Sequence, residues 1–533
     1  MRLLSMLFKR WAMYRLSKAT NLRDIQRWML RKHARRTALV VGATTLRFEQ
    51  LEQQVQRWAQ AFHDAGLRVG DGILVIIDDP LYSVIVRFAG VEAGLVQLSL
   101  RPDQPIDFVC ACARRAAPKL ALLDCRLADA LGCALQTDLP ELIVWPFSAG
   151  GELTQRIAQS PAVPIGEKVP LETPVSLGFT SGTTGQPKML QLQQQQMLAS
   201  MRLMLLNIDD VGKRDASMLI AVPLHGAGGG VLMPVLLAGG SAIVPIRHDV
   251  AELVHVLRQQ RPSRVFVTPS QLIDLLDCDA LQDSDMRPVE QLIYGSAPLA
   301  VARIREAITR FGPILQQGYG MSEALPPVAM LPPSAHVDDA NQVFDSALSS
   351  VGKVARGVAV EVRSERGEIV AVGETGRIWV KTPTVFSGYV DQPSMNALVF
   401  DSHGFYFTGD MGYFDSRQRL HVLDRLQDVI PRAGLVVYPR QVEEYVHECV
   451  GVKEAVLVAV EEVLHLVVSA RTHPPAPPSA VLVQRVGDHL RTCLPAYAIP
   501  QQIHVWQDLP RSALGKVLRR DVRAALQERG SAA

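Results

Sequence analysis

Residues 179–188 read Phe-Thr-Ser-Gly-Thr-Thr-Gly-Gln-Pro-Lys, and an apolar run, Val175–Phe179, leads into them. The apolar run predicts a strand, and the polar segment predicts a loop at its end. Glycine lets backbone amides turn toward a ligand, hydroxyl groups donate hydrogen bonds, and Lys188 supplies a positive charge. The segment therefore suits a polyphosphate, although its spacing is not that of a Walker loop. The plainer alternative is a polar surface loop.

The flanking sequence alternates short apolar runs with helical patterns, which is typical of parallel sheets covered by helices. Val301–Phe311 has helical periodicity and is followed by Gly312. Around residues 350–420 short strands and glycine turns predict a small β subdomain. The predicted strands are Gly72–Ile77, Leu120–Leu123, Leu142–Val144, Met218–Val222, Ala242–Pro245, Arg264–Thr268 and Gln291–Tyr294.

Composition narrows the class of protein. A chain of 533 residues is too long for one core, so at least two domains are expected. The net charge of +2 gives no case for nucleic-acid binding. The seven cysteines are scattered and form no CxxC pair, which favours reduced thiols in a cytoplasmic protein.

The N-terminal segment, residues 1–36, is strongly basic. It holds eleven Lys or Arg against one acid, Asp24, with apolar residues interleaved. It contains no apolar run long enough for a signal peptide or a spanning helix. The segment is either a solvated basic helix or a peripheral membrane contact with anionic lipid.

Four further motifs carry chemistry. Gln317-Gly-Tyr-Gly-Met-Ser-Glu323 follows the apolar pair Ile314-Leu315, which we interpret as a strand end, where ligands bind in α/β sheets. Tyr294-Gly-Ser-Ala-Pro-Leu299 ends another strand with small residues that leave room for a purine. Tyr406-Phe-Thr-Gly-Asp410 places a carboxylate after a tight turn, where it can accept from ribose hydroxyls. Leu509-Pro-Arg-Ser-Ala-Leu-Gly-Lys516 ends in a lysine. Each alone could be a turn or a solvent-exposed side chain.

Together, in this order, the five motifs resemble those of the adenylate-forming superfamily, which includes acyl-CoA synthetases, peptide-synthetase adenylation domains and luciferases. The resemblance runs from about residue 40 to the end of the chain. It implies an α/β fold: a large N-terminal AMP-binding domain (37–424) with mostly parallel sheets flanked by helices and a β subdomain (350–420). A small, mobile C-terminal α/β lid domain (425–533) follows a hinge near Arg425.

The resemblance also assigns roles to matching residues. Lys188, Glu323 and Lys516 would be catalytic, with Glu323 supporting Mg²⁺ and Lys516 reaching into the site from the small domain. Asp410 would bind ribose with help from Arg425, and Gly434 would line the thiol approach. The other expected nucleotide contacts are Thr180, Ser181, Gly182, Thr183, Thr184, Gly185, Gly295, Ser296, Ala297, Tyr319, Gly320 and Ser322.

These groups fit one reaction. Attack of a carboxylate on the α-phosphate of ATP brings two anions together, so the site needs cations and precise positioning. The resemblance implies that the acyl-AMP then passes to the thiol of coenzyme A. ATP, Mg²⁺ and coenzyme A are the expected cofactors.

Three segments depart from the family pattern. At the hinge, Asp424 replaces a usual glycine and Gln427 a usual acid or lysine, and one of two usual glycines is missing near Gly434. A glutamine-rich run, Leu190–Met197, is expected to face solvent on a helix. Pro223-Leu-His-Gly-Ala-Gly-Gly-Gly230 resembles the acyl-pocket motif, in which His225 would line the pocket and the glycines would leave space for a sizeable acyl chain.

The leading interpretation is an AMP-forming acyl-CoA synthetase for fatty or aryl acids, and fatty acid metabolism is the expected setting. An acyl-AMP ligase, or a synthetase that loads the phosphopantetheine of an acyl carrier protein, is the main alternative. An amino-acid adenylation domain, a luciferase-type oxidase and a non-catalytic nucleotide- or acyl-binding homologue are weaker alternatives.

Overall fold

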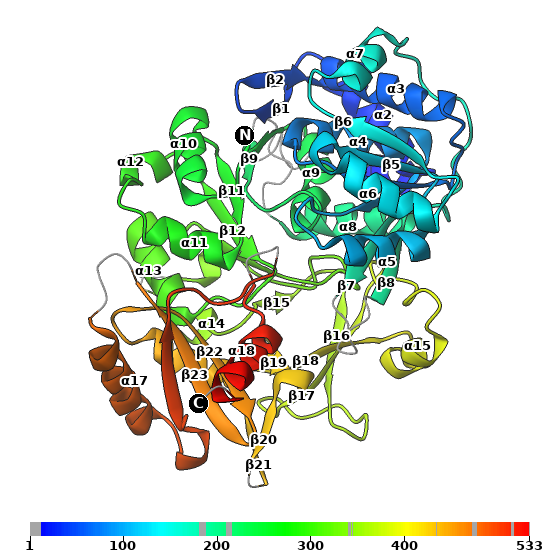
Figure 1. Cartoon of the computed structure of the whole chain (residues 1–533). Helices are drawn as coiled ribbons and strands as arrows, with labels where there is room; N and C mark the ends of the chain where they lie inside the picture. The colour runs from blue at the N-terminus through cyan, green and yellow to red at the C-terminus, as the bar shows by residue number, and fades with distance from the viewer. Residues whose placement is uncertain are drawn as a thin grey trace.

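The computed structural model describes residues 12–180, 188–208, 216–338, 343, 345–432, 434–471, 477–512 and 516–531. We use "large domain" for the described residues up to Arg425 and "small domain" for those that follow. The large domain is built on two sheets covered by helices, and the small domain lies against it (Figure 1). Within the described residues, no helix is both long and apolar enough to cross a membrane.

A nine-stranded sheet forms one half of the large domain. Its order is β15-β14-β13-β12-β11-β9-β10-β1-β2, and the strands from β13 to β1 pair in parallel. Parallel pairing brings the carboxyl ends of β12 and β13 to the same edge. The strands are β1 (Thr37–Val41), β2 (Thr44–Arg47), β9 (Ser217–Ile220), β10 (Ser241–Val244), β11 (Arg264–Val267), β12 (Gln291–Gly295), β13 (Leu315–Tyr319), β14 (Ala329–Leu331) and β15 (Lys353–Val354).

A six-stranded sheet forms the other half, with the order β6-β5-β3-β4-β7-β8. Only the pair β7–β8 is antiparallel in this sheet, and Thr180 at the end of β7 lies opposite Lys188 at the start of β8. The strands are β3 (Gly72–Ile76), β4 (Val96–Ser99), β5 (Leu120–Asp124), β6 (Ile143–Phe147), β7 (Pro174–Thr180) and β8 (Lys188–Gln193).

Helices cover both sheets because each presents an apolar stripe to the core. In α13, for example, Ile304, Ala307 and Ile308 are buried. The helices of the large domain are α2 (Leu22–Lys32), α3 (Phe48–Asp64), α4 (Pro80–Ala93), α5 (Ile106–Ala116), α6 (Cys125–Asp138), α7 (Glu152–Gln159), α8 (Gln194–Asn207), α9 (Ala227–Leu237), α10 (Val250–Gln260), α11 (Pro269–Leu276), α12 (Asp283–Met286), α13 (Val301–Phe311), α14 (Asp345–Leu348) and α15 (Pro393–Val399).

The β subdomain is a four-stranded antiparallel sheet in the order β16-β17-β18-β19. Its core around Val362, Ile378 and Val380 also includes Ala324 and Val328, which follow β13. The sheet is therefore tied to the edge where β12 and β13 end. Its strands are β16 (Ala359–Arg363), β17 (Gly376–Lys381), β18 (Tyr406–Phe414) and β19 (Leu420–Arg425).

The small domain packs a three-stranded sheet, β22-β23-β24, and a hairpin, β20–β21, against helices. Val446, Leu457, Leu466 and Val486 are fully or almost fully buried in its own core. Its elements are β20 (Ile430–Arg432), β21 (Leu435–Val437), α16 (Pro439–His447), β22 (Val452–Val460), β23 (Val463–Ala470), α17 (Ser479–Cys493), β24 (Gln502–Trp506) and α18 (Arg519–Ser531).

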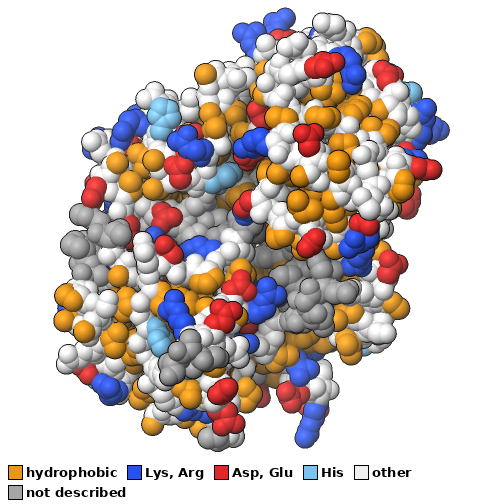
Figure 2. Space-filling model, viewed as in Figure 1, with side chains coloured by type: hydrophobic (Ala, Val, Ile, Leu, Met, Phe, Trp, Pro, Cys, Tyr) orange, Lys and Arg blue, Asp and Glu red, His pale blue; other side chains and the backbone are white. Residues whose placement is uncertain are grey.

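The described part of the basic N-terminal segment packs onto the large domain. Residues 12–18 are helical, and Leu16, together with Leu22 and Met29, is buried in the main core. Arg27 forms a salt bridge with Glu92 at 2.5 Å. Figure 2 shows acidic and basic side chains interspersed over one face of the molecule, with no large patch of one sign.

Each strand predicted from the sequence overlaps a strand of the structure, and α13 has the predicted bounds. The glutamine-rich run is a correction, because Gln194 and Gln196 are 3% and 2% exposed. Gln194 accepts a hydrogen bond from the Leu22 backbone and donates one to Pro170, whereas Gln196 donates to Val385. These amides join α8 to distant segments instead of facing water.

Candidate active site

A carboxylate is fixed between two sheets at the centre of the candidate site. Asp410 on β18 lies opposite Arg425 on β19, and Arg425 Nε is 2.8 Å from Asp410 Oδ1. The Tyr319 hydroxyl, at the end of β13, donates to Asp410 Oδ2. Burial and the nearby Asp410 hold the pKa of Tyr319 well above its usual value. Asp410 raises the pKa of Arg425, so the guanidinium stays charged.

Two strand predictions near this carboxylate are wrong in detail. Asp410 lies within β18 and does not follow a tight turn, although Gly409 has a positive φ of 80°. Tyr319 likewise ends β13 and does not follow a strand that stops at Leu315. In both cases glycines inside a short strand resemble turn residues in the sequence, so the pattern alone misplaced the strand ends.

The second carboxylate, Glu323, lies close to the phosphate-loop lysine. Its Oε1 accepts a hydrogen bond of 3.0 Å from the Tyr389 hydroxyl. Lys188 Nζ lies 5.1 Å from the centre of the Tyr389 ring and 3.8 Å from Met395 Sδ. The structure thus brings both groups to one aromatic side chain, Glu323 to its hydroxyl and Lys188 to its ring. The sequence predicted no role for Tyr389. The glycine before it, Gly388, is the one neighbouring residue that could have drawn attention to this segment.

The expected purine wall lies where β12 and β13 end side by side. A side chain at Gly295 would come 2.6 Å from the Gly318 carbonyl, and one at Gly320 would come 2.8 Å from Pro326. Ser296 adopts a positive φ of 71°, a strained value for a residue with a side chain, and Ala297 follows it. Ser322 is exposed at the same edge. Small residues therefore let the backbone approach closely here.

The phosphate loop itself is only partly described. Thr180 ends β7 and Lys188 begins β8. Ser181, Gly182, Thr183, Thr184 and Gly185 lie outside the described residues.

Lys516 reaches the site from the small domain. Its backbone N–H donates to the Ser512 hydroxyl at 3.2 Å, and its side chain is exposed. Partial desolvation and then Arg425 lower the pKa of its amine, whereas Asp410 and Asp428 act in the opposite direction. Lys516 is thus within electrostatic range of the Asp410–Arg425 pair. Gly434, expected on the thiol path, has a φ of 76° in the β20–β21 turn.

His225 lies at the start of α9 beside the glycine run. Burial, with smaller contributions from Arg101 and His248, lowers its pKa to about 4, so the imidazole is neutral near pH 7. Side chains at Gly228 or Gly229 would collide with backbone carbonyl oxygens, whereas one at Gly230 would meet no atom within 4 Å. Gly228 and Gly229 are therefore closely packed against the backbone, whereas the space beside Gly230 is open.

Asp424, the departure at the hinge, has a structural role. Its Oδ2 accepts from the Arg440 backbone at 2.9 Å and its Oδ1 from the Arg425 backbone at 3.0 Å. A carboxylate at this point accepts a hydrogen bond from a free N–H group in the first turn of α16. Its negative charge also interacts favourably with the positive end of the helix dipole.

Polar contacts hold the small domain against the large one. Glu444 on α16 accepts from the Val301 backbone at 2.9 Å, and α13 has no side-chain cap of its own. Arg471 binds Glu306 at 2.9 Å and also Asp277. Lys453 lies 2.7 Å from Asp274. The sequence contained no pattern from which these pairs could be predicted.

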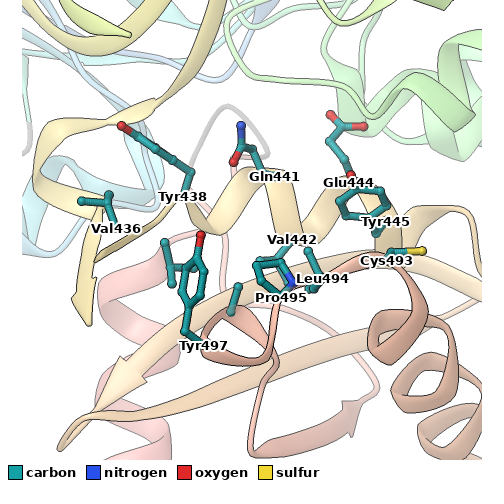
Figure 3. A pocket seen from close by; sticks show the side chains of 12 residues that line it. Val436, Tyr438, Gln441, Val442, Glu444, Tyr445, Cys493, Leu494, Pro495 and Tyr497 are labelled. Atoms are coloured by element: carbon teal, nitrogen blue, oxygen red, sulfur yellow. The ribbon is translucent and has the colours of Figure 1, made fainter. Parts of the chain in front are cut away.

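A cavity of about 310 Å³ lies in the small domain, away from the Asp410–Arg425 pair. Figure 3 shows Tyr438, Gln441 and Glu444 extending from α16 above it, with Pro495 and Tyr497 below. Glu444 is the side chain that caps α13, so this cavity borders the contact between the domains.

Metal binding was tested against the side chains present. The described residues contain no group of three or more His, Cys, Asp or Glu that could hold an ion. Glu323 Oε2 takes no hydrogen bond from any residue that the structure describes. A single carboxylate with a free oxygen fits Mg²⁺ held mainly by nucleotide phosphates.

Comparisons with known proteins agree with this geometry. The chain is 29% identical to a feruloyl-CoA synthase of an Amycolatopsis species, over 94% of this chain and 97% of the relative. It is 28% identical to a medium/long-chain-fatty-acid–CoA ligase of Mycobacterium tuberculosis, over 94% and 89%. The ATP-bound structure of MatB from Rhodopseudomonas palustris superposes with a TM-score of 0.82 at 24% identity, over 94% and 99%.

The predicted superfamily, its two-domain α/β fold and the class of AMP-forming acyl-CoA ligase are confirmed. The family model for AMP-binding enzymes matches residues 25–390, and the model for their C-terminal domain matches residues 441–516. The chain therefore belongs to the AMP-binding enzyme family.

Proposed function

We propose that the protein converts an aryl or fatty carboxylic acid into its coenzyme A thioester. The carboxylate attacks the α-phosphate of ATP, pyrophosphate leaves, and the thiol of coenzyme A then displaces AMP from the acyl-AMP. The observation that carries this proposal is the approach of Lys516, from the small domain, to the Asp410–Arg425 pair of the large domain.

In this proposal each group has one task. Asp410 accepts from the ribose hydroxyls, and Arg425 holds it oriented. Lys188 and Lys516 offset the charge that builds on the phosphate oxygens, and Glu323 would hold Mg²⁺, which would add positive charge there. The nucleotide is bordered by Tyr319, Gly295, Ser296, Ala297, Gly320 and Ser322. The contacts expected of Ser181–Gly185 stay a prediction from the sequence, because those residues lie outside the described part of the chain.

The acid would lie beside α9. His225 is exposed and its pKa is lowered to about 4, so near pH 7 it presents an uncharged imidazole to an acyl group. The open side of Gly230 leaves room for a ring or a chain. The named activities of the two relatives, on an aromatic and on a fatty acid, support both classes of substrate.

A panel of aromatic and fatty acids, scored by AMP release, tests the proposal. Release that requires both the acid and ATP, together with thioester formation when coenzyme A is added, is the expected result. Thioester formation with a holo acyl carrier protein and not with coenzyme A would favour the alternative acceptor. Acid-independent ATP hydrolysis, or none at all, would contradict the proposal.

The basic N-terminus is proposed to contact anionic lipid at the periphery of a membrane. Several of its cations are engaged within the fold, as Arg27 is by Glu92. The test therefore removes residues 1–11, which precede the buried Leu16. Equal co-sedimentation of the full and shortened chains with anionic vesicles would contradict this contact.

A further inference from the structure

Tyr389 lies between the two oppositely charged groups of the candidate site. Its hydroxyl donates to Glu323 Oε1 at 3.0 Å, and its ring receives Lys188 Nζ at 5.1 Å from the centroid. Carboxylate and ammonium groups this close to each other would tend to form a direct ion pair. An aromatic side chain can bind both without neutralising either, because its hydroxyl is a donor and its face attracts cations.

The position of Tyr389 is fixed by its surroundings. It is 6% exposed and packs edge-to-face on Phe386, with ring centroids 4.9 Å apart. Asn396 Oδ1 accepts from the Tyr389 backbone N–H at 2.8 Å, and Asn396 Nδ2 donates to its carbonyl at 2.9 Å. These two bonds clamp the peptide groups on both sides of the Cα atom.

The segment that carries Tyr389 also contacts the backbone near both of its partners. Phe386 N–H donates to the Glu323 carbonyl, and Tyr389 pairs with Leu190 on β8, two residues after Lys188. The Tyr389 side chain therefore lies between elements of the six-stranded and nine-stranded sheets. Its orientation sets the separation of Lys188 and Glu323.

We propose that Tyr389 is a positioning residue that holds the Glu323 carboxylate toward Mg²⁺ and keeps Lys188 available to the nucleotide phosphates. This inference rests on the proposed function, because Glu323 and Lys188 have those partners only if ATP binds here.

Calorimetric titration of ATP, with Mg²⁺ and with EDTA, tests this role independently of turnover. Tyr389→Phe keeps the ring and removes the hydroxyl. We expect it to reduce the tightening of ATP binding by Mg²⁺ about tenfold, the scale of one hydrogen bond to a charged group. ATP affinity in EDTA should change less than about twofold, because the cation–π contact is retained.

Tyr389→Leu removes both contacts and should also weaken ATP binding in EDTA about threefold, through Lys188. Tyr497→Phe, in the small-domain cavity, is the matched control and should leave both titrations unchanged. If Tyr389 acts through Glu323, Tyr389→Phe should have no further effect in a Glu323→Gln background. Additive effects of these two substitutions would mean a merely structural role.

Equal Mg²⁺ dependence in Tyr389→Phe and the wild type would overturn the inference while leaving the proposed function intact. If the wild type binds Mg²⁺-ATP but forms no acyl-AMP with any acid, the proposed function fails and the titrations still test Tyr389. Thermal melting of each variant establishes that it is folded. Should Tyr389→Phe be unfolded, Glu323→Gln carries the test, and an unchanged Mg²⁺ dependence in that variant would overturn the inference.

Discussion

The large-domain and small-domain sides of the site are held in different ways. Asp410 is bound by Arg425 from the neighbouring strand and by Tyr319 from another sheet. Lys516 is itself exposed, and its domain is held against the large one by contacts such as Arg471–Glu306 and Glu444–Val301. The proposed ribose-binding carboxylate is thus part of the large-domain framework, whereas the proposed catalytic lysine belongs to a domain joined to it by polar contacts. The second half of the reaction requires this difference if Lys516 is to withdraw.

The largest effect is expected when the positive charge of Lys516 is removed. We expect Lys516→Ala to reduce acid-dependent pyrophosphate release about 10²–10³-fold, because one preorganised charge at the transition state is lost. ATP binding should remain, since the Asp410–Arg425 pair is untouched. Rapid-quench measurement of acyl-AMP provides the test. A decrease smaller than about threefold would contradict the role of Lys516.

Loosening the contact between the domains should have a smaller and more selective effect. Arg471→Ala removes its links to Glu306 and Asp277, which as charged hydrogen bonds contribute roughly 1.5–3 kcal/mol each. We expect acyl-AMP formation to decrease about tenfold, while transfer from preformed acyl-AMP to coenzyme A is unchanged.

Arg491→Ala, which removes an exposed pair with Asp488 inside α17, is the matched control. It should leave both half-reactions unchanged. Equal loss of both half-reactions in Arg471→Ala would mean that this contact does not distinguish the two domain arrangements.

The alkaline pH dependence sharpens the comparison further. Partial desolvation and Arg425 lower the pKa of Lys516, so its amine loses its charge below the ordinary lysine value of about 10.4. Acyl-AMP formation should therefore decrease as pH rises toward that value, whereas thiol transfer should lack this particular limb. Lys516→Arg stays charged and should flatten the limb, whatever its absolute rate. Persistence of the limb in that variant would assign it to another group.

The smallest expected effect is on the stability of the large domain and does not involve the candidate site. Gln194→Ala would leave the Leu22 N–H and Pro170 carbonyl without this partner, at a cost of about 1–3 kcal/mol in the free energy of unfolding. Gln195→Ala, at an exposed position in the same run, should change it by less than about 0.5 kcal/mol. Urea unfolding of both variants, followed by circular dichroism, measures the difference. Equal stabilities would mean that the buried amide is not part of the framework.

Local patterns were sufficient for much of the fold. Apolar runs predicted β3, β5, β9, β10, β11 and β12, and periodicity predicted α13 with its bounds. These signals are local because a buried strand or an amphipathic helix must carry its apolar residues at a fixed spacing. Motif order then predicted the family, which is confirmed, and it assigned roles to the charged residues of the site that stay predictions.

Other features depend on partners that lie far away in the chain. Tyr389 meets Glu323 across 66 residues, and Arg471 meets Glu306 across 165. The buried glutamines were misjudged for the same reason, because whether an amide faces water depends on what packs against it. Residue types and their order are enough to predict which chemistry the chain can hold. Long-range packing decides which side chain orients each group, because hydrogen bonds between distant segments leave no periodic trace in the sequence.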